Sequence, residues 1–423
     1  MKIKIMMVLA AVLMIGMAGA TSYQGATTFD ENISYIDSTN TINTFDFYSS
    51  PSGGDSFVFS GSFWSLVNAR YISQKIVVGP ESDPYSFLYT FKTDGVDDCV
   101  QIQQAIDVGK GDVLIKIGQY NLTNQVKFRS NNSNVHIVGE GNAFSHSQLD
   151  AEKNSEQFVS MWMFPSEVIR ATFNIYNTTD AAFYFPSGAA GLTIENVAFY
   201  YPEQNPDAMV EYPPTIEGSD WYVADVIIRD CFAINPYRFI HFPRLDKSQI
   251  YNIRGQPIYE GIRIDSNPDW ITLRNIHFSP GFWNTEMYGN DTRKFRYNNG
   301  TALHIENADW PMITNVVAFG YKHGLYGNTT KNAMVTGCGF DACKYPVYIL
   351  NGDENIITGS QFVQCSEFIS DDTPHPTDGA AIEFVGGSYN IVLGNVIRYS
   401  NTSIINSGAS LIAEHNQEID LTP

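Results

Sequence analysis

The chain of 423 residues has few basic residues for its size. Lysine and arginine number 25 against 45 aspartates and glutamates, which gives a formal net charge of −20. A protein that binds nucleic acid or an anionic membrane surface needs a basic patch to displace counterions. We therefore expect no nucleic-acid partner, and an anionic glycan would need local basic residues or bound cations.

Cysteine is too sparse for a disulfide framework or a zinc site. The five cysteines leave at least one unpaired, and the two nearest, Cys338 and Cys343, lack the partners that zinc requires. Cys343 and Cys365 are separated by one step of the repeat described below. The repeat would therefore stack them, either as buried thiols or as a disulfide.

Long apolar runs are absent after the first twenty residues. Lys2 and Lys4 precede an apolar run from Ile5 to Met17, which is followed by Ala18-Gly19-Ala20. This pattern is typical of a secretory signal peptide, residues 1–20. No later segment is long enough to insert into a membrane. We expect a secreted or cell-surface protein, and eight Asn-x-Ser/Thr sequons agree with a glycoprotein.

What the chain does contain is a repeat in which an aliphatic residue and a spacer precede Asn, Asp or Gly. Its seven copies begin at Ile194, Ile228, Leu273, Ile313, Val335, Ile357 and Leu393, at intervals of 34, 45, 40, 22, 22 and 36 residues. The shortest step, of about 22 residues, is one turn of a parallel β-helix, and the longer intervals predict inserted loops. The third position predicts a structural ladder of turns, because these residues tolerate left-handed conformations. Its polar members are Asn196, Asp230, Asn275, Asn315 and Asn395.

The segment before the repeat predicts a helix and a strand. Asp97 or Asp98 can cap a helix that stops at Gly109–Gly111, and 113–117 alternates as a strand does. We expect this short helix to cover the end of the solenoid. The domain organisation is then a signal peptide at 1–20, a segment of uncertain structure at 21–85, and a β-helix at 86–423.

The same segment carries a resemblance to a known family. Its residues are Thr93-Asp94-Gly95-Val96-Asp97-Asp98, Gln101-Ile102-Gln103, Ala105-Ile106, Gly111-Asp112-Val113 and Gly118-Gln119-Tyr120. They resemble the N-terminal signature of the pectate-lyase superfamily, more narrowly its rhamnogalacturonase/epimerase-like members, although Ile117 replaces a frequent proline. The resemblance implies an all-β, right-handed, single-stranded parallel β-helix of the pectin-lyase-like kind. It does not name a reaction, because the family includes lyases, glycoside hydrolases, epimerases, tailspikes and non-catalytic proteins.

The polygalacturonase branch of this family is not a match. Its members carry N-x-D, D-D, G-H and R-x-K elements on consecutive turns. This chain has Asn307-Ala308-Asp309 and Lys322-His323-Gly324, but it lacks the aspartate pair between them and the R-x-K element. We therefore expect no polygalacturonase activity.

Three segments ahead of repeat copies place an isoleucine between two polar residues. They are Thr215-Ile216-Glu217, Arg263-Ile264-Asp265 and His304-Ile305-Glu306. Side chains alternate along a strand, so each isoleucine should point inward and its neighbours outward. Stacking predicts one outward column of Glu217, Asp265 and Glu306, and another of Thr215, Arg263 and His304.

Stacked carboxylates repel unless a cation, a basic neighbour or a shared proton intervenes. A Ca²⁺ ion held by Glu217, Asp265 and Glu306 could bind a uronate and acidify its C5 proton, with Arg263 or His304 as base. Without a metal, two carboxylates suit a glycoside hydrolase. The catalytic candidates are Arg263, His304, Asp265 and Glu306, and an inert charge ladder is the alternative.

Basic and aromatic residues nearby are candidates for substrate binding. Arg238 and His323 each fall ten residues after a leading aliphatic, and Lys322 precedes His323. Trp270 and Trp310 each follow an aspartate after the second and third acids. Such groups can hold a sugar carboxylate and stack on a sugar ring. Ordinary surface and packing roles are the alternative.

The sequence thus predicts a secreted carbohydrate-active protein that binds and cleaves a polysaccharide, with a lyase acting on an acidic glycan as the leading hypothesis. A glycoside hydrolase and a non-catalytic, adhesin-like glycan-binding glycoprotein are the alternatives. β-Helix proteins of this kind can trimerise, so a homotrimer is also open.

Overall fold

The computed structural model describes residues 33–36, 42–45, 76–108, 111–129, 135–141, 170–205, 208–279, 291–363, 380–398, 400 and 402–419. The chain divides into two compact units, Met1–Val77 with Pro84–Thr90, and Val78–Asp83 with Phe91–Pro423. The first contains the antiparallel strands β1 (Ile33–Ile36) and β2 (Ile42–Phe45) and the 3₁₀ helix η1 (Ser86–Leu88). The predicted signal peptide and Cys365 lie outside the described residues.

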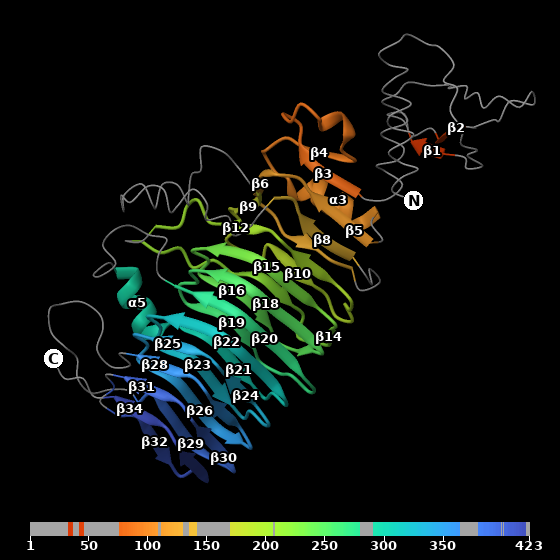
Figure 1. Ribbon diagram of the computed structural model, residues 1–423. Coiled ribbons are helices and arrows are strands. Elements are labelled where there is room, and N and C mark those ends of the chain that lie inside the picture. The colour runs from red at the N-terminus through yellow and green to blue at the C-terminus, as the bar shows by residue number, and fades with distance from the viewer. Residues whose placement is uncertain are drawn as a thin grey trace, which may run out of the picture. The chain divides into compact units, whose positions relative to one another are not determined.

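Ten strands of the second unit form one parallel sheet, called the site sheet below (Figure 1). In chain order they are β7 (Val126–Lys127), β10 (Phe183–Phe185), β13 (Pro214–Gly218), β16 (Arg238–Phe242), β19 (Glu260–Ile264), β21 (Thr301–Glu306), β23 (His323–Asn328), β26 (Tyr345–Asp353), β29 (Ile382–Ser388) and β32 (Ile404–Ser407). Spatial order follows chain order, so each coil of the chain contributes one strand.

The other strands of the coils form a second sheet of twenty strands. They are β3 (Ile76–Pro80), β4 (Phe91–Thr93), β5 (Gly111–Ile115), β6 (Gly118–Leu122), β8 (Val135–Gly139), β9 (Ala171–Ile175), β11 (Thr193–Glu195), β12 (Ala198–Tyr200), β15 (Ile227–Ile234), β18 (Ser248–Gly255), β20 (Ile271–Phe278), β22 (Pro311–Phe319), β24 (Met334–Thr336), β25 (Gly339–Asp341), β27 (Ile356–Thr358), β28 (Gln361–Val363), β30 (Asn390–Leu393), β31 (Val396–Arg398), β33 (Leu411–Glu414) and β34 (Gln417–Ile419). A short pair, β14 (Val223–Ala224) with β17 (Leu245–Asp246), lies at a corner between the two sheets. The expected parallel β-helix is confirmed, while its right-handed winding stays a prediction.

The repeat forms because its leading aliphatics stack inside the solenoid. Ile194, Ile228, Leu273, Ile313 and Val335 are at most 1% exposed. Removing each such side chain from water stabilises the fold by about 2 kcal/mol.

The repeat found in the sequence omitted one coil. Ile250-Tyr251-Asn252 on β18 pairs with Ile228 on one side and Leu273 on the other. The interval between Ile228 and Leu273 therefore contains two coils that meet at Ile250, and the expectation of an inserted loop there is wrong. This copy does not have the phenylalanine that follows most other copies, because Gly255 occupies the position that Phe278 has on the next coil.

The turn ladder is confirmed as structural. Asn196, Asp230, Asn252, Asn275 and Asn315 all have φ between 52° and 56°. Asn252 donates to Asp230, Asn275 to Asn252, and Asn315 to Asn275, at 2.8–2.9 Å. These residues therefore join consecutive coils by their side chains as well as by the backbone.

The last copy of the repeat begins one residue earlier than expected. Ile357 pairs with Val392, so Gly394, with φ of 63°, takes the turn. Asn395 is instead buried and accepts a hydrogen bond from Ser360 N at 2.9 Å.

The expected helix forms as α3 (Cys99–Val108), and a second helix, α5, spans Asp291–Asn299. Asp97 caps α3 weakly, with Oδ1 3.4 Å from Cys99 N. Asp98 instead accepts from Gly95 N and Asn121 N. The covering role of α3 stays a prediction.

The four described cysteines, which include Cys343, are buried free thiols. Burial raises the pKa of the Cys343 thiol to about 12. Among the described residues, no helix combines the length and hydropathy needed to cross a membrane.

Candidate functional site

The site sheet presents a column of charged residues on its outer face. The strand register pairs Glu217 with His241, His241 with Arg263, and Arg263 with His304. Ile240, which precedes His241, is buried, and so are its partners Ile216 and Ile262 on the adjoining strands. Because paired residues of neighbouring strands lie about 4.8 Å apart, the four charged groups meet on one face.

A second column begins two residues further along the same strands. Asp265 and Glu306 directly follow the paired residues Ile264 and Ile305, so they lie side by side. The predicted stacking of Arg263 on His304 and of Asp265 on Glu306 therefore agrees with the register.

The expected positions of Glu217 and Thr215 are wrong. Glu217 lies in the column of Arg263, with His241 between them. Thr215 is fully buried, and its hydroxyl is 2.5 Å from that of Tyr201. The strand β16 of the unrecognised coil lies between β13 and β19, and through it Ile216 aligns with Ile262 and not, as expected, with Ile264.

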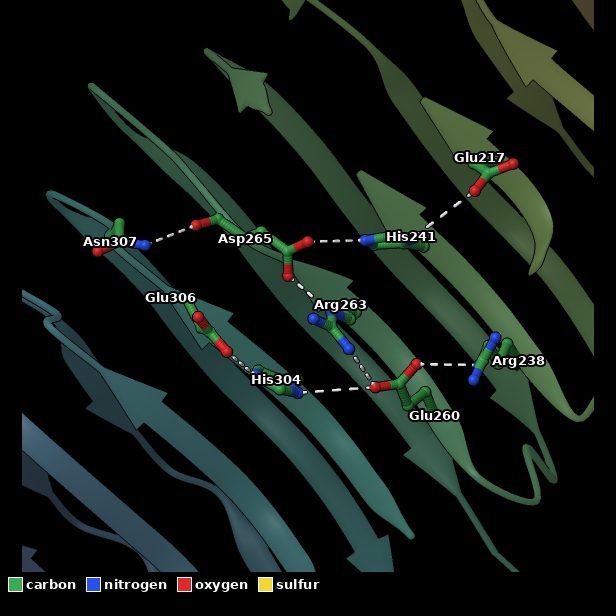
Figure 2. Close-up of polar contacts among 9 residues, drawn as sticks. All are labelled: Glu217, Arg238, His241, Glu260, Arg263, Asp265, His304, Glu306 and Asn307. Carbon is green, nitrogen blue, oxygen red and sulfur yellow. Dashed lines mark hydrogen bonds and ion pairs between the residues drawn. The ribbon is translucent and has the colours of Figure 1, made fainter. Parts of the chain in front are cut away.

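His241 lies between two carboxylates (Figure 2). Its Nε2 is 2.9 Å from Asp265 Oδ2, and its Nδ1 is 3.8 Å from Glu217 Oε1. Burial disfavours the imidazolium, but the hydrogen bond to Asp265 and the nearby carboxylate of Glu217 outweigh it and raise the pKa of His241 to about 9. Burial also opposes ionisation of Asp265, yet its bonds with His241 and Arg263 lower its pKa. At neutral pH both groups are therefore charged.

Arg263 joins this pair to the rest of the cluster. Its Nε donates to Asp265 Oδ1 at 2.6 Å, and its Nη1 donates to Glu260 Oε1 at 2.9 Å. Burial works against the guanidinium charge, but the two carboxylates raise the pKa of Arg263 further above its usual value. Arg263 thus supplies a fixed positive charge.

Glu260 is the most buried member, with a side chain 7% exposed. Besides Arg263, it has Arg238 Nε 3.4 Å from Oε2 and His304 Nδ1 3.7 Å from Oε1. Burial raises the pKa of Glu260, but its contacts with His304 and Arg263 lower it overall. Glu260 is therefore ionised and holds three basic groups together.

His304 lies at the end of the cluster, between Glu260 and Glu306. Its Nε2 is 2.5 Å from Glu306 Oε1, and its ring meets the Tyr326 ring edge-on at 4.7 Å between centroids. Figure 2 shows the unbroken series from β13 to β21, called the charge network below. Its members are Glu217, His241, Asp265, Arg263, Glu260, His304 and Glu306, with Arg238 bound to Glu260.

Two members were not predicted as site residues, Glu260 and His241. Both could have been found from spacing, because Arg238 and Glu260, like His241 and Arg263, are separated by one step of the repeat. This spacing becomes apparent only when the coil at Ile250 is included in the repeat.

The three acids expected to bind calcium do not form one set of ligands. Both oxygens of Asp265 are engaged, by Arg263 and His241, and His241 stands between Asp265 and Glu217. Within the described residues, no group of three or more His, Cys, Asp or Glu is arranged to hold a metal ion. We therefore derive no step through a metal, and the calcium prediction needs a direct test.

The predicted basic cluster shares a column with Glu260. The register runs from Arg238 through Glu260 and Thr301 to His323, three coils rather than two. Burial, with smaller contributions from nearby cations including Lys322, lowers the pKa of His323 to about 3. His323 is therefore neutral, and Lys322 lies just before its strand.

Tyrosines continue the outer column past His304. The register stacks Tyr326 on His304 and Tyr348 on Tyr326, and the two tyrosine rings are parallel within 7° at 5.8 Å. Glu383 follows on β29. On the other side of the network, Tyr184 pairs with Glu217. The polar face thus extends beyond the network in both directions.

Trp270 and Trp310 lie at the corner that follows β19 and β21. Each directly precedes a strand of the second sheet, and Trp310 is 51% exposed while Trp270 is half-buried.

No protein-family model matches the sequence, and neither does any curated protein. Several solved structures are similar at low identity. The A-module of the mannuronan C-5 epimerase AlgE6 of Azotobacter vinelandii is 13% identical, with 78% of this chain and 97% of that chain covered and a TM-score of 0.43. DFA-IIIase from Arthrobacter chlorophenolicus A6, without its lid and in complex with GF2, is 14% identical, with coverages of 82% and 99% and a TM-score of 0.45.

PfbA, a surface adhesin of Streptococcus pneumoniae, is 13% identical, with coverages of 78% and 91% and a TM-score of 0.45. These identities and TM-scores are too low to assign a function. The fold and the candidate site are therefore described from this chain's own residues.

Proposed function

We propose that this protein binds a polysaccharide along the outer face of the site sheet and cleaves it as a lyase acting on an acidic glycan. The observation that carries the proposal is the charge network, which places three cations, four carboxylates and an oriented histidine on one face of the protein.

The shape of the face suits a polymer. The outer column runs through seven consecutive strands, from Glu217 on β13 to Glu383 on β29. Six steps of about 4.8 Å make a surface about 29 Å long, the length of several sugar rings. Tyrosines on it offer ring faces and edges to sugars.

The charges favour a lyase over a hydrolase. A glycoside hydrolase needs a carboxylic acid that stays protonated near its working pH. The pKa values of Glu260 and Asp265 are lowered, so neither carboxylate can serve as that acid. Burial raises the pKa of Glu383, but this residue lies three strands beyond His304 and outside the charge network.

A lyase needs positive charge around the uronate carboxylate instead. Arg238, Arg263 and protonated His241 are the cations of the network, and Arg238, with a side chain 41% exposed, is the one most open to a substrate.

His304 is the group that we assign to proton transfer. Glu306 holds its Nε2 at 2.5 Å, while Nδ1 lies 3.7 Å from Glu260, beyond hydrogen-bond distance. Nδ1 can therefore take the C5 proton as the C4–oxygen bond breaks and a C4–C5 double bond forms, while the departing sugar oxygen takes a proton from water. The imidazolium produced is stabilised by both carboxylates. Arg263 is unsuited as base because its charge is held by two acids.

The test uses purified protein and a panel of acidic and neutral polysaccharides, with calcium or with EDTA. We expect an unsaturated product, seen by its ultraviolet absorbance, and a loss of at least ~100-fold in turnover for His304→Gln. His136→Gln is a matched control, because His136 also pairs with a carboxylate, Asp112, at 3.2 Å on a different face of the coil. It should keep full activity.

Other results would reassign the protein. New reducing ends without the unsaturated product would make it a hydrolase, and binding without either product would make it a display protein. An absence of binding to every glycan would reject the proposal, and loss of activity with EDTA would restore the calcium prediction.

A further inference from the structure

At the corners after β21, β23, β26 and β29, one residue in the left-handed conformation lies at an equivalent position. The register pairs Asp309 with Lys331, Lys331 with Asp353, and Asp353 with Ser388. The residues that follow these therefore stack, and their φ values are 54° for Trp310, 54° for Asn332, 58° for Glu354 and 58° for Tyr389. These four coils thus keep the left-handed conformation with four different side chains.

Trp310 is poorly suited to that position. A bulky residue is strained at positive φ, whereas asparagine, as at Asn332 on the next coil, tolerates it. The backbone cannot relax, because Trp310 N donates to Lys331 O at 3.0 Å and Asn332 Nδ2 donates to Asp309 Oδ1 at 2.9 Å. Yet 51% of Trp310 is exposed, so burial does not compensate for the strain. Tyr389 shares this strain and exposure, but only Trp310 lies on a coil of the charge network, and its position there points to a role outside folding.

Trp270 directly precedes β20 one coil earlier, as Trp310 directly precedes β22, but its own φ is not positive. Ile271 pairs with Pro311 and Asn267 bridges to Ala308, so Trp270 and Trp310 are neighbours about 4.8 Å apart along the stack. These two residues of adjacent coils are called the tryptophan ledge below.

The tryptophan ledge belongs to the two coils that carry the centre of the charge network. Trp270 follows Asp265 by five residues, and Trp310 follows Glu306 by four. Asp269 lies beside it and is 3.5 Å from Lys247 Nζ. Indole faces bind the C–H faces of sugars, and adjacent carboxylates and ammonium groups bind their hydroxyls. A sugar ring is therefore the occupant that this chemistry fits.

We infer that Trp270 and Trp310 form a further subsite for the same polysaccharide, outside the residues that react with it. This inference rests on the proposed function and adds a binding surface to it. Neither tryptophan takes part in proton transfer, so the subsite acts on affinity alone.

Trp310→Asn tests the inference without endangering the fold. Asparagine is the residue that the next coil places in this turn, so the melting temperature should stay level or rise. Affinity for the polysaccharide that the wild-type protein binds should fall about tenfold, since an aromatic contact of this size is removed. In the cleavage assay, KM should rise while kcat stays constant.

Tyr389→Asn is the matched control. Tyr389 has the same turn and a similar φ, is 72% exposed, and lies three coils from Trp310. Its replacement should relieve the same strain and leave glycan affinity unchanged.

The outcomes separate this inference from the proposed function. If the wild type binds a glycan and Trp310→Asn binds it equally well, the tryptophan ledge is not a subsite and the proposed function survives. If the variant changes the oligomeric state in sedimentation but not the glycan affinity, the ledge is a contact between copies of the chain. If the wild type binds no glycan, both ideas are rejected together.

Discussion

His241 is held in place by opposite charges on two sides, and its protonation is therefore coupled to the stability of the fold. Its folded pKa is about 9, against an ordinary value of 6.5. A raised pKa contributes stability that is complete below pH 6.5 and is lost as pH rises to about 9. At about 1.4 kcal/mol for each pH unit, the loss approaches 3 kcal/mol.

This loss predicts a pH dependence that His241→Gln should weaken. Urea unfolding of the wild type should give a free energy that falls by about 3 kcal/mol between pH 6.5 and 9. In the variant, which has no proton to lose at this position, the fall should be much smaller. His415→Gln, at a side chain 82% exposed, serves as the control. Equal slopes in wild type and His241→Gln would show that the pair with Asp265 does not stabilise the fold.

At the scale of the single element, the turn ladder links one coil to the next. Asn275 has φ of 52°, donates to Asn252 and accepts from Asn315. Two separate properties of asparagine are used there, its tolerance of the left-handed conformation and its paired amide groups.

Two substitutions should separate these properties. Asn275→Gly keeps the conformation and loses two hydrogen bonds, so it should lower the free energy of unfolding by about 1–2 kcal/mol. Asn275→Ala also acquires backbone strain and should lose about 1–2 kcal/mol more. Thermal or urea unfolding would measure both.

Gly337 provides the reverse control at the same turn. It has φ of 63°, and an added Cβ would meet no atom within 4 Å. Gly337→Ala should therefore show strain alone, and Gly337→Asn should be the better tolerated of the two. If alanine matched asparagine at both positions, the conformation of the turn would not be what selects the residue.

At the scale of the whole molecule, the repeat period was sufficient to predict the parallel β-helix but not every coil. The coil at Ile250 was missed because Gly255 stands where most copies have phenylalanine. Stacking on neighbouring coils holds that segment in place without the phenylalanine. A sequence pattern contains the residue type that is commonest at a position, whereas other residue types can also pack there.

The same omission decided which site residues could be predicted. Arg263, His304, Asp265 and Glu306 come from adjacent coils that were both recognised, so their columns were predicted correctly. Glu217 was misplaced because a strand lay between. Glu260 was overlooked because it precedes Gly261 at the start of β19, where the alternation of outward residues is interrupted.

A solenoid should tolerate the loss of a whole coil but not of half a coil. Met334 pairs with Ile356, so deleting residues 335–356 would join Met334 to Ile357 in register. We expect this deletion variant to keep its β-sheet circular dichroism and a cooperative melt at lower temperature, because each coil contacts only its neighbours.

Deleting residues 335–345 alone is the control, since it removes half a coil and joins Met334 of the second sheet directly to Pro346 of the site sheet. That variant should aggregate or unfold. Survival of both deletions, or of neither, would contradict the picture of interchangeable coils.

The direction of the hydrogen bonds between coils has a mechanical consequence. Bonds such as Gly337 N to Thr358 O, at 3.2 Å, run along the stack, whereas the covalent chain circles around it. Tension on the ends of this unit therefore acts on bonds that can break coil by coil. Each coil that peels away would release about 75 Å of chain, since an extended residue spans about 3.4 Å. Under load the solenoid would lengthen in even steps and absorb work, as an extensible tether does.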